Sequence, residues 1–101
     1  MWWWVSSHAL AELQQWYAAQ CDGDWEHSCG IRIGTLDNPG WRVDIHLTET
    51  RLETLPFDAV EAERSETDWI HASVRDSVFI GRGGPGNLEE ILELFVRWSR
   101  I

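Results

Sequence analysis

Two cysteines and one histidine lie close together in the sequence and are candidates for metal binding or nucleophilic chemistry. Cys21, His27 and Cys29 have the spacing C-x5-H-x-C, which is not a known zinc-knuckle pattern, and a closed structural zinc site needs four ligands. His46 or His71 would supply the fourth only if the fold happened to bring it near. A catalytic thiol needs nearby positive charge or a helix N-terminus to lower its pKa, whereas the residues in between are acidic: Asp22, Asp24 and Glu26. We therefore predict no metal site and keep a small metal-binding domain or enzyme built on Cys21, His27 and Cys29 as the alternative.

A glycine-rich stretch, Gly81-x-Gly83-Gly84-x-Gly86, precedes an expected helix and invites comparison with phosphate-binding loops. Its spacing is not that of a dinucleotide-binding turn, and it lacks the Lys-Ser/Thr pair of a P-loop. We interpret it as a turn between a strand and a helix. Carboxylates are abundant, but no recognisable catalytic motif frames any set of them. We therefore predict that the protein is not an enzyme and has no cofactor.

Tryptophan is unusually frequent, with eight in the chain, and several lie beside acidic residues. An indole ring flanked by carboxylates suits a protein–protein interface, where the ring fills a pocket and the acids meet basic groups of the partner. We predict a partner-binding surface made of two loops and a strand start, with the acids on either side of Trp25 as its centre. Its residues are Asp22, Asp24, Trp25, Glu26, Asp37, Trp41, Asp68 and Trp69.

The other tryptophans have simpler explanations. Trp16 and Trp98 fall on apolar helical stripes, and Trp41 also falls on an apolar strand face, so all three are expected in the core. The alternative for Trp25 and Trp69 is that they only cap the edges of a sheet. The leader Trp2–Trp4 is expected either to dock across the sheet or to form an exposed patch.

Charge and length limit the classes of partner. The 101 residues contain 8 basic and 17 acidic side chains, for a net charge of −9. Nucleic-acid binding needs a positive patch, so this balance disfavours nucleic acid and favours a basic protein partner. The longest apolar run, Met1 to Val5, is far shorter than the ~20 residues of a membrane span. We expect a cytoplasmic protein without a membrane partner, folded as one domain over residues 1–101 with a Trp-rich leader at residues 1–5.

The first half of the chain predicts a helix and a hairpin. Residues 6–20 have a helical stripe of apolar residues (Leu10, Leu13, Trp16 and Tyr17), with Ser6 or Ser7 as N-cap. The helix is expected to end at Asp22-Gly23, and residues 21–30 are expected to form a polar loop. Strands are predicted at 30–36 and 41–47 around the turn 37–40. Apolar and polar residues alternate in the second strand, and Ile31 and Ile33 supply the apolar face of the first.

The second half predicts more strands and a final helix. Residues 57–64 are a weaker strand candidate that also suits a helical turn, and clearer strands are expected at 69–74 and 78–82. Asn87 is expected to cap a helix over 88–99, with Glu90 completing a capping box. We predict an α+β fold: an N-terminal helix, an antiparallel four- to five-stranded meander sheet and a C-terminal helix, with both helices on one sheet face. Leu13, Trp16, Leu92 and Phe95 are expected to share the core.

Four motifs together resemble the immunity protein 53 family of bacterial polymorphic toxin systems. They are L-x2-W-Y-x2-Q-C-D-G-D-W-E-H (Leu13 to His27), T-L-D-N-P-G-W (Thr35 to Trp41), E-R-S-E-x-D-W (Glu63 to Trp69) and G-G-P-x-N-L-E-E-I-L (Gly83 to Leu92). The resemblance implies a small α+β protein, encoded next to a toxin, that binds the toxin domain and blocks it. Many such toxins are basic nucleases, and an acidic inhibitor would be steered toward a phosphate-binding groove. The resemblance implies no particular interface residues.

Overall fold

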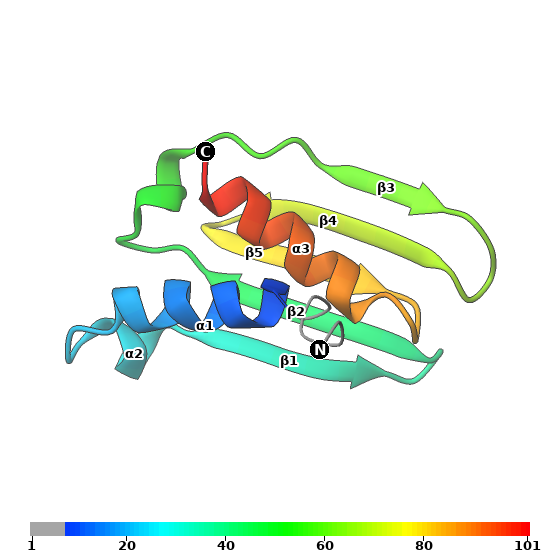
Figure 1. The fold of residues 1–101 in the computed structure, drawn as a ribbon, viewed down its shortest axis with the longest axis horizontal. Coiled ribbons are helices and arrows are strands. Elements are labelled where there is room, and N and C mark those ends of the chain that lie inside the picture. Colours follow the sequence, from blue (N-terminus) through cyan, green and yellow to red (C-terminus); the bar gives the residue numbers. More distant parts are fainter. Residues whose placement is uncertain (1–7) are drawn as a thin grey trace, which may run out of the picture.

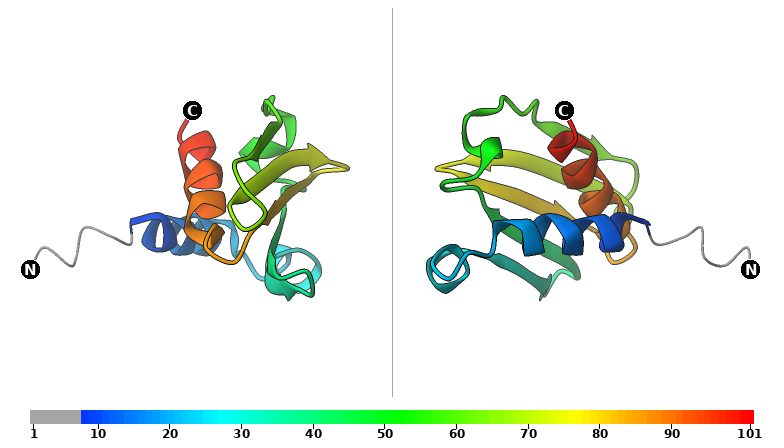
Figure 2. Two further views of the ribbon diagram at one scale, coloured as in Figure 1. Left: turned by 90° about the vertical axis from the view of Figure 1, so that its right-hand side faces the viewer. Right: turned by 60° about the vertical axis from the view of Figure 1, so that its left-hand side comes forward.

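A five-stranded antiparallel sheet carries two helices on one of its faces (Figures 1 and 2). The structure is a computed structural model that describes residues 8–101; the expected Ser6 or Ser7 cap and Trp2–Trp4 lie outside this part. The predicted α+β class is confirmed. In chain order the elements are α1 (His8–Gln20), α2 (Trp25–Ser28), β1 (Ile31–Leu36), β2 (Gly40–His46), a 3-10 helix (Arg51–Thr54), β3 (Val60–Glu63), β4 (Trp69–Arg75), β5 (Val78–Gly83) and α3 (Leu88–Ser99).

The strand order is β1-β2-β5-β4-β3, so the predicted meander is wrong at one connection. The β1–β2 hairpin and the β3–β4–β5 run are each sequential. Residues 47–59, however, carry the chain from β2 to the far edge of the sheet, and β5 returns to pair with β2. Leu52 anchors this connection in the core with 1% of its surface exposed. Residues 57–64, the weaker candidate, contain a true strand, β3, because Ala62 pairs with Ile70 of β4.

The two helices pack beside each other on the same face, as predicted. Leu13, Leu92 and Phe95 are buried, and the half-buried ring of Trp16 meets that of Phe95 edge to face with 5.0 Å between centroids. Phe79 of β5 contacts Phe95 at 5.2 Å, which joins the helix pair to the sheet. Aromatic edge-to-face packing of this kind adds to the free energy gained by burial alone.

The glycines of β5 allow α3 to lie directly on the sheet. A Cβ atom at Gly81 would lie 2.4 Å from Cγ2 of Ile91, and one at Gly83 would lie 3.1 Å from Cδ1 of the same residue. The glycine-rich stretch is therefore explained largely by helix–sheet contact. The capping box is not formed: Asn87 is the N-cap of α3 but makes no side-chain cap hydrogen bond. Its amide donates instead to Glu90 at 3.0 Å and to Asp68 at 2.9 Å.

Only part of the apolar stripe of α1 is buried in the core. Ala9 and Leu13 face the core, whereas Leu10 is 50% exposed and Tyr17 is 37% exposed. Ile33 of β1 is also 42% exposed, so it does not contribute to the core as predicted. It lies on the helix-covered side of the sheet by alternation with Ile31, but β1 is an edge strand and the helices do not cover it. No helix in residues 8–101 has the length and apolar character to cross a membrane.

Candidate functional site

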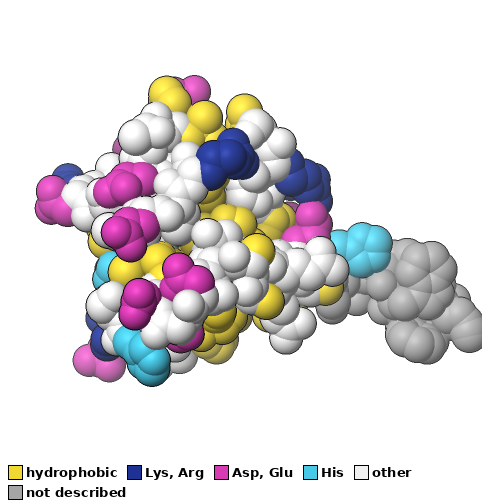
Figure 3. Space-filling model, turned by 90° about the vertical axis from the view of Figure 1, so that its left-hand side faces the viewer, with side chains coloured by type: hydrophobic (Ala, Val, Ile, Leu, Met, Phe, Trp, Pro, Cys, Tyr) yellow, Lys and Arg dark blue, Asp and Glu magenta, His cyan; other side chains and the backbone are white. Residues whose placement is uncertain are grey.

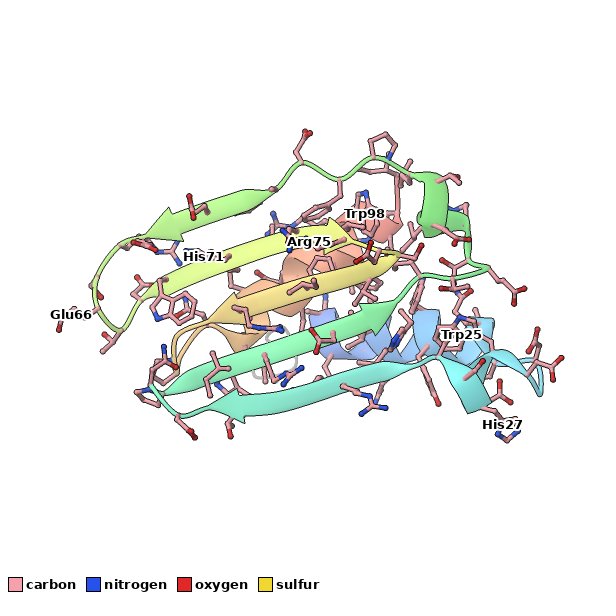
Figure 4. The ribbon with its side chains drawn as sticks, turned by 180° about the vertical axis from the view of Figure 1, so that it is seen from behind. Trp25, His27, Glu66, His71, Arg75 and Trp98 are labelled. Atoms are coloured by element: carbon pink, nitrogen blue, oxygen red, sulfur yellow. The ribbon has the colours of Figure 1, made fainter. Side chains whose placement is uncertain are left out.

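The structure separates the eight predicted partner-binding residues into two groups at opposite ends of the sheet. The loop with Trp25 lies at the start of β1, and the turn from Asp37 to Trp41 lies at its other end. Trp69 begins β4 at the same end as this turn, because Trp41 and Ile70 both pair with Gly83. Figure 4 shows Trp25 and His27 at one end and Glu66 toward the other. The eight residues therefore do not form one patch.

The loop at Asp22–Glu26 is a rigid structure held by its own carboxylates. Oδ1 of Asp22 accepts hydrogen bonds from the backbone N–H groups of Asp24 and Trp25, both at 2.9 Å. The Glu26 carboxylate accepts from the N–H groups of Asp22 at 2.9 Å and Gly23 at 2.8 Å. Gly23 has φ +95°, a left-handed conformation that favours glycine. Part of the expected polar loop is therefore the short helix α2, and two of its three acids have a structural role.

Trp25 is buried, with 4% of its surface exposed, so its indole does not offer the surface for a partner that the sequence predicts there. Its Nε1 donates to the carbonyl oxygen of Thr48 at 3.0 Å, and its ring meets those of Trp16 and Tyr17 edge to face. The ring thus fixes the loop to α1 and to the β2–β3 connection. The side chain of Asp24 remains exposed on top of it.

Backbone hydrogen bonds lower the pKa of two of the loop carboxylates, Asp22 and Glu26. Those from the backbone N–H groups of Trp25 and then Asp24 lower the pKa of Asp22 below its ordinary value. For Glu26, backbone N–H groups also lower the pKa, first its own and then those of Asp22 and Gly23, against the opposing effect of desolvation. A carboxylate that accepts several N–H bonds is stabilised in its charged form. The loop therefore presents fixed negative charge at neutral pH.

Three further acids join this loop from distant parts of the sequence. The Glu53 carboxylate accepts from the N–H of Glu49 at 3.0 Å and from the Ser77 hydroxyl at 3.1 Å, next to Asp76. We call the six carboxylates the acidic end; they are Asp22, Asp24, Glu26, Glu49, Glu53 and Asp76. Figure 3 shows Asp and Glu side chains gathered over this end of the molecule. Sequence reasoning missed the last three because only the β2–β3 connection and the β4–β5 turn bring them there.

The second group lies around the β1–β2 turn. Trp41 is half-buried, and its Nε1 donates to the Pro85 carbonyl at 2.9 Å. The Asp68 carboxylate accepts from Arg64 and from Asn87, and these bonds, Arg64 first, lower its pKa. Trp69 is half-buried on the sheet face away from the helices, where it lines a shallow hollow of about 450 Å³. Asp37 is exposed in the turn.

The proposed metal ligands do not come together. Cys21 donates its thiol proton to the carbonyl of Tyr17, and His27 is exposed on α2. Within residues 8–101 the donor atoms that do converge belong to another set: Glu61, Glu63 and His71, all within 4.8 Å of one another. His71 Nε2 lies 2.9 Å from the Glu63 carboxylate, which explains this set as a cross-strand polar contact between β3 and β4. The alternative of a site built on Cys21, His27 and Cys29 therefore has no support in the geometry.

The sheet face opposite the helices is polar and close to electrically balanced. It carries half of the eight arginines, and alternation places three acids among them: Asp44, Glu61 and Glu63. Asp44 pairs with Arg42 at 2.6 Å and Arg82 at 3.0 Å. Burial acts to raise the pKa of Asp44, but hydrogen bonds from the two arginines outweigh it and the pKa is lowered. The excess negative charge of the protein therefore lies on its other surfaces. The arginines on this face are Arg32, Arg42, Arg75 and Arg82.

Comparison with known proteins gives one match. A family model described as immunity protein 53 matches residues 10–100. Neither the curated proteins nor the solved structures include a significant match. The matched range contains the whole sheet, the acidic end and all of α3.

Proposed function

Because this chain belongs to the immunity protein 53 family, we propose that it protects a bacterial cell by binding, in the cytoplasm, a toxin domain encoded beside its own gene. The family match over residues 10–100 carries this proposal. In it the chain acts as an inhibitor held by a protein–protein interface and not as an enzyme. Two of the motifs that resemble the family, Asp22–Glu26 and Asp37–Trp41, contain residues whose hydrogen bonds hold the fold together. A structural role for these residues is consistent with their place in a family motif.

We assign the first contact with the toxin to the acidic end. Six carboxylates from three segments gather there, and hydrogen bonds from backbone N–H groups lower the pKa of Asp22 and Glu26 and so stabilise their charged forms. The partner that suits this surface is a basic domain, such as a nuclease whose active site attracts phosphate. Clustered charge of one sign raises the association rate with a partner of opposite sign, and salt screens the effect. We assign a secondary contact with the toxin to the opposite end of the sheet, which carries Asp37, Trp41, Asp68 and Trp69.

Charge reversal tests this assignment. The variant Asp24→Arg/Glu49→Arg changes two exposed acids whose side chains make no hydrogen bond in the described chain. The matched control, Asp37→Arg/Glu66→Arg, makes the same change of charge at the opposite end. At low salt we expect the first variant to associate with the toxin roughly tenfold more slowly and with a weaker salt dependence, as steering charges do. The control should change the rate much less.

The two association rates show whether the position of the acidic residues or only the net charge of the protein controls binding. Equal slowing by both variants would mean that only net charge matters, and slowing by the control alone would move the contact to the Asp37 end. Circular dichroism of each variant confirms that it remains folded. Glu26→Arg is less suitable, because it also removes the hydrogen bonds that hold the loop.

A further inference from the structure

Within residues 8–101, most of the large apolar side chains that are exposed lie in one region. Four large apolar residues are exposed in residues 8–101, and three of them (Leu10, Tyr17 and Ile33) lie on the facing sides of α1 and β1. The fourth, Ile101, is at the end of the chain. Scattered exposed apolar residues are ordinary, but a contiguous group marks an interaction surface.

These residues border a groove between α1 and β1. A hollow of about 480 Å³ is bordered by Leu13 and Tyr17 of α1, by Ile31 and Arg32 of β1 and by the intervening Glu26 and Gly30. Figures 1 and 2 show that α1 runs alongside β1 in the opposite direction. Leu10 therefore continues the helical wall one turn beyond Leu13, and Ile33 continues the strand side two residues beyond Ile31.

The floor of this groove is an unpaired sheet edge. β1 is the terminal strand of the sheet, and among residues 8–101 its backbone forms ladder hydrogen bonds only with β2. The N–H of His46 donates to the carbonyl of Gly30 at 3.0 Å. By the alternation of an antiparallel ladder, the backbone groups of Ile31, Ile33 and Thr35 then point away from β2. Their side chains are the ones that face the groove.

The two edges of the sheet differ in how they discourage pairing. The opposite edge, β3, has only four residues and carries Glu61 and Glu63. β1 has six residues and no proline, and its one charged residue, Arg32, borders the hollow although alternation turns its side chain toward the opposite face of the sheet. Natural proteins usually protect an edge with charge, proline or short length; β1 is neither short nor interrupted by proline, and its residues 31, 33 and 35, which face the helix side, are uncharged.

We propose that an extended segment of the toxin adds to the edge of β1 and places apolar side chains, at alternate positions, in the groove beside Leu10, Tyr17 and Ile33. The inference rests on the proposed function and specifies its interface. Charge favours a toxin segment over a second copy of this chain: Glu26 lines both the groove and the acidic end, so a basic residue next to the segment meets carboxylates. A second copy carries a net charge of −9 and would meet like charge there. In strand addition of this kind, main-chain hydrogen bonds between the two strands provide affinity, and the fit of every second side chain provides specificity.

Substitutions of exposed residues test the groove without disturbing the core. We expect Ile33→Glu and, separately, Leu10→Glu to raise the Kd for the toxin domain at least tenfold, mainly through faster dissociation. Ile101→Glu is the matched control, because it makes the same change on a 74% exposed isoleucine outside the groove, and it should change the Kd less than threefold. The added negative charge would speed association with a basic partner, so a loss of affinity is not an effect of steering. Hydrogen exchange adds a direct readout: the amides of Ile31, Ile33 and Thr35, which point away from β2, should become protected in the complex.

Each other result overturns the inference. If wild-type protein binds the toxin and both groove variants bind equally well, the interface lies elsewhere although the proposed function stands. If wild-type protein does not bind the toxin, the proposed function itself fails. A dimer in sedimentation that Ile33→Glu dissociates would assign the groove to a second copy. A large fall in the melting temperature of the free Ile33→Glu protein, with toxin binding unchanged, would mean that Ile33 stabilises the fold of the free chain and not the complex.

Discussion

Replacement of Trp25 distinguishes an interface tryptophan from a buried anchor. The ring is 4% exposed and contacts Trp16 and Tyr17 edge to face, and its Nε1 bonds the Thr48 carbonyl at 3.0 Å. Removing a buried aromatic side chain costs about 3–5 kcal/mol, and a domain of this size has roughly 5–15 kcal/mol in total. Trp25→Ala should therefore lower the free energy of unfolding by about 3 kcal/mol or more. At ~4–8 °C per kcal/mol, the melting temperature should fall by roughly 12 °C or more.

The assay is urea and thermal unfolding followed by circular dichroism, because removal of a tryptophan changes the fluorescence itself. Trp25→Phe keeps most of the ring and loses the Nε1 hydrogen bond, so its cost should be nearer ~1 kcal/mol. Trp69→Ala is the control on the sheet face away from the helices, where the half-buried ring should cost less. An unchanged unfolding midpoint for Trp25→Ala, together with much weaker toxin binding, would refute the anchoring role and restore Trp25 as a contact residue.

Three further perturbations test the packing and the charges. Phe95→Ala removes a side chain with 0% exposure and should cost about 3–5 kcal/mol in urea unfolding; an unshifted midpoint would contradict the helix–helix core. Gly81→Ala places a Cβ atom 2.4 Å from Ile91 and should cost ~1–3 kcal/mol, whereas Gly86→Ala, with nothing within 4 Å, should be nearly neutral. The lowered pKa of Asp44 means that its contribution to stability is present above the unfolded-state pKa of about 3.9 and is lost as pH falls through the folded-state pKa. Asp44→Asn should thus be less stable than wild type at neutral pH and should lose less stability on acidification; parallel pH profiles would count against the ion pairs.

Local periodicity predicted most of the elements of this fold. The apolar stripe on residues 88–99 and the alternation of apolar and polar residues in β2 each indicate the correct buried face. Both patterns arise because one side of each element is buried in the core. Strand order did not follow from the same signals. The meander prediction failed because the mostly polar residues 48–56 carry no local signal of their path, and the burial of Leu52 in this connection depends on tertiary contacts.

The candidate site was predictable in composition but not in geometry. The motif around Trp25 is largely structural, because Asp22 and Glu26 accept hydrogen bonds from the loop backbone. Sequence alone could not distinguish a buried from an exposed indole in the polar loop of residues 21–30. The predicted apolar stripe of α1 was the available signal for the groove, because it included Leu10 and Tyr17, which the structure leaves exposed while Leu13 is buried.

The most direct measurement is protection of cells by this chain against the toxin encoded beside its gene. The toxin domain is expressed from an inducible promoter in a bacterial host, alone or with the wild-type chain, and growth is followed together with co-purification of the two proteins. We predict that the chain restores growth and co-purifies with the toxin domain in a defined ratio. Growth arrest in the presence of folded, well-expressed chain, with no complex recovered, would contradict the proposed function.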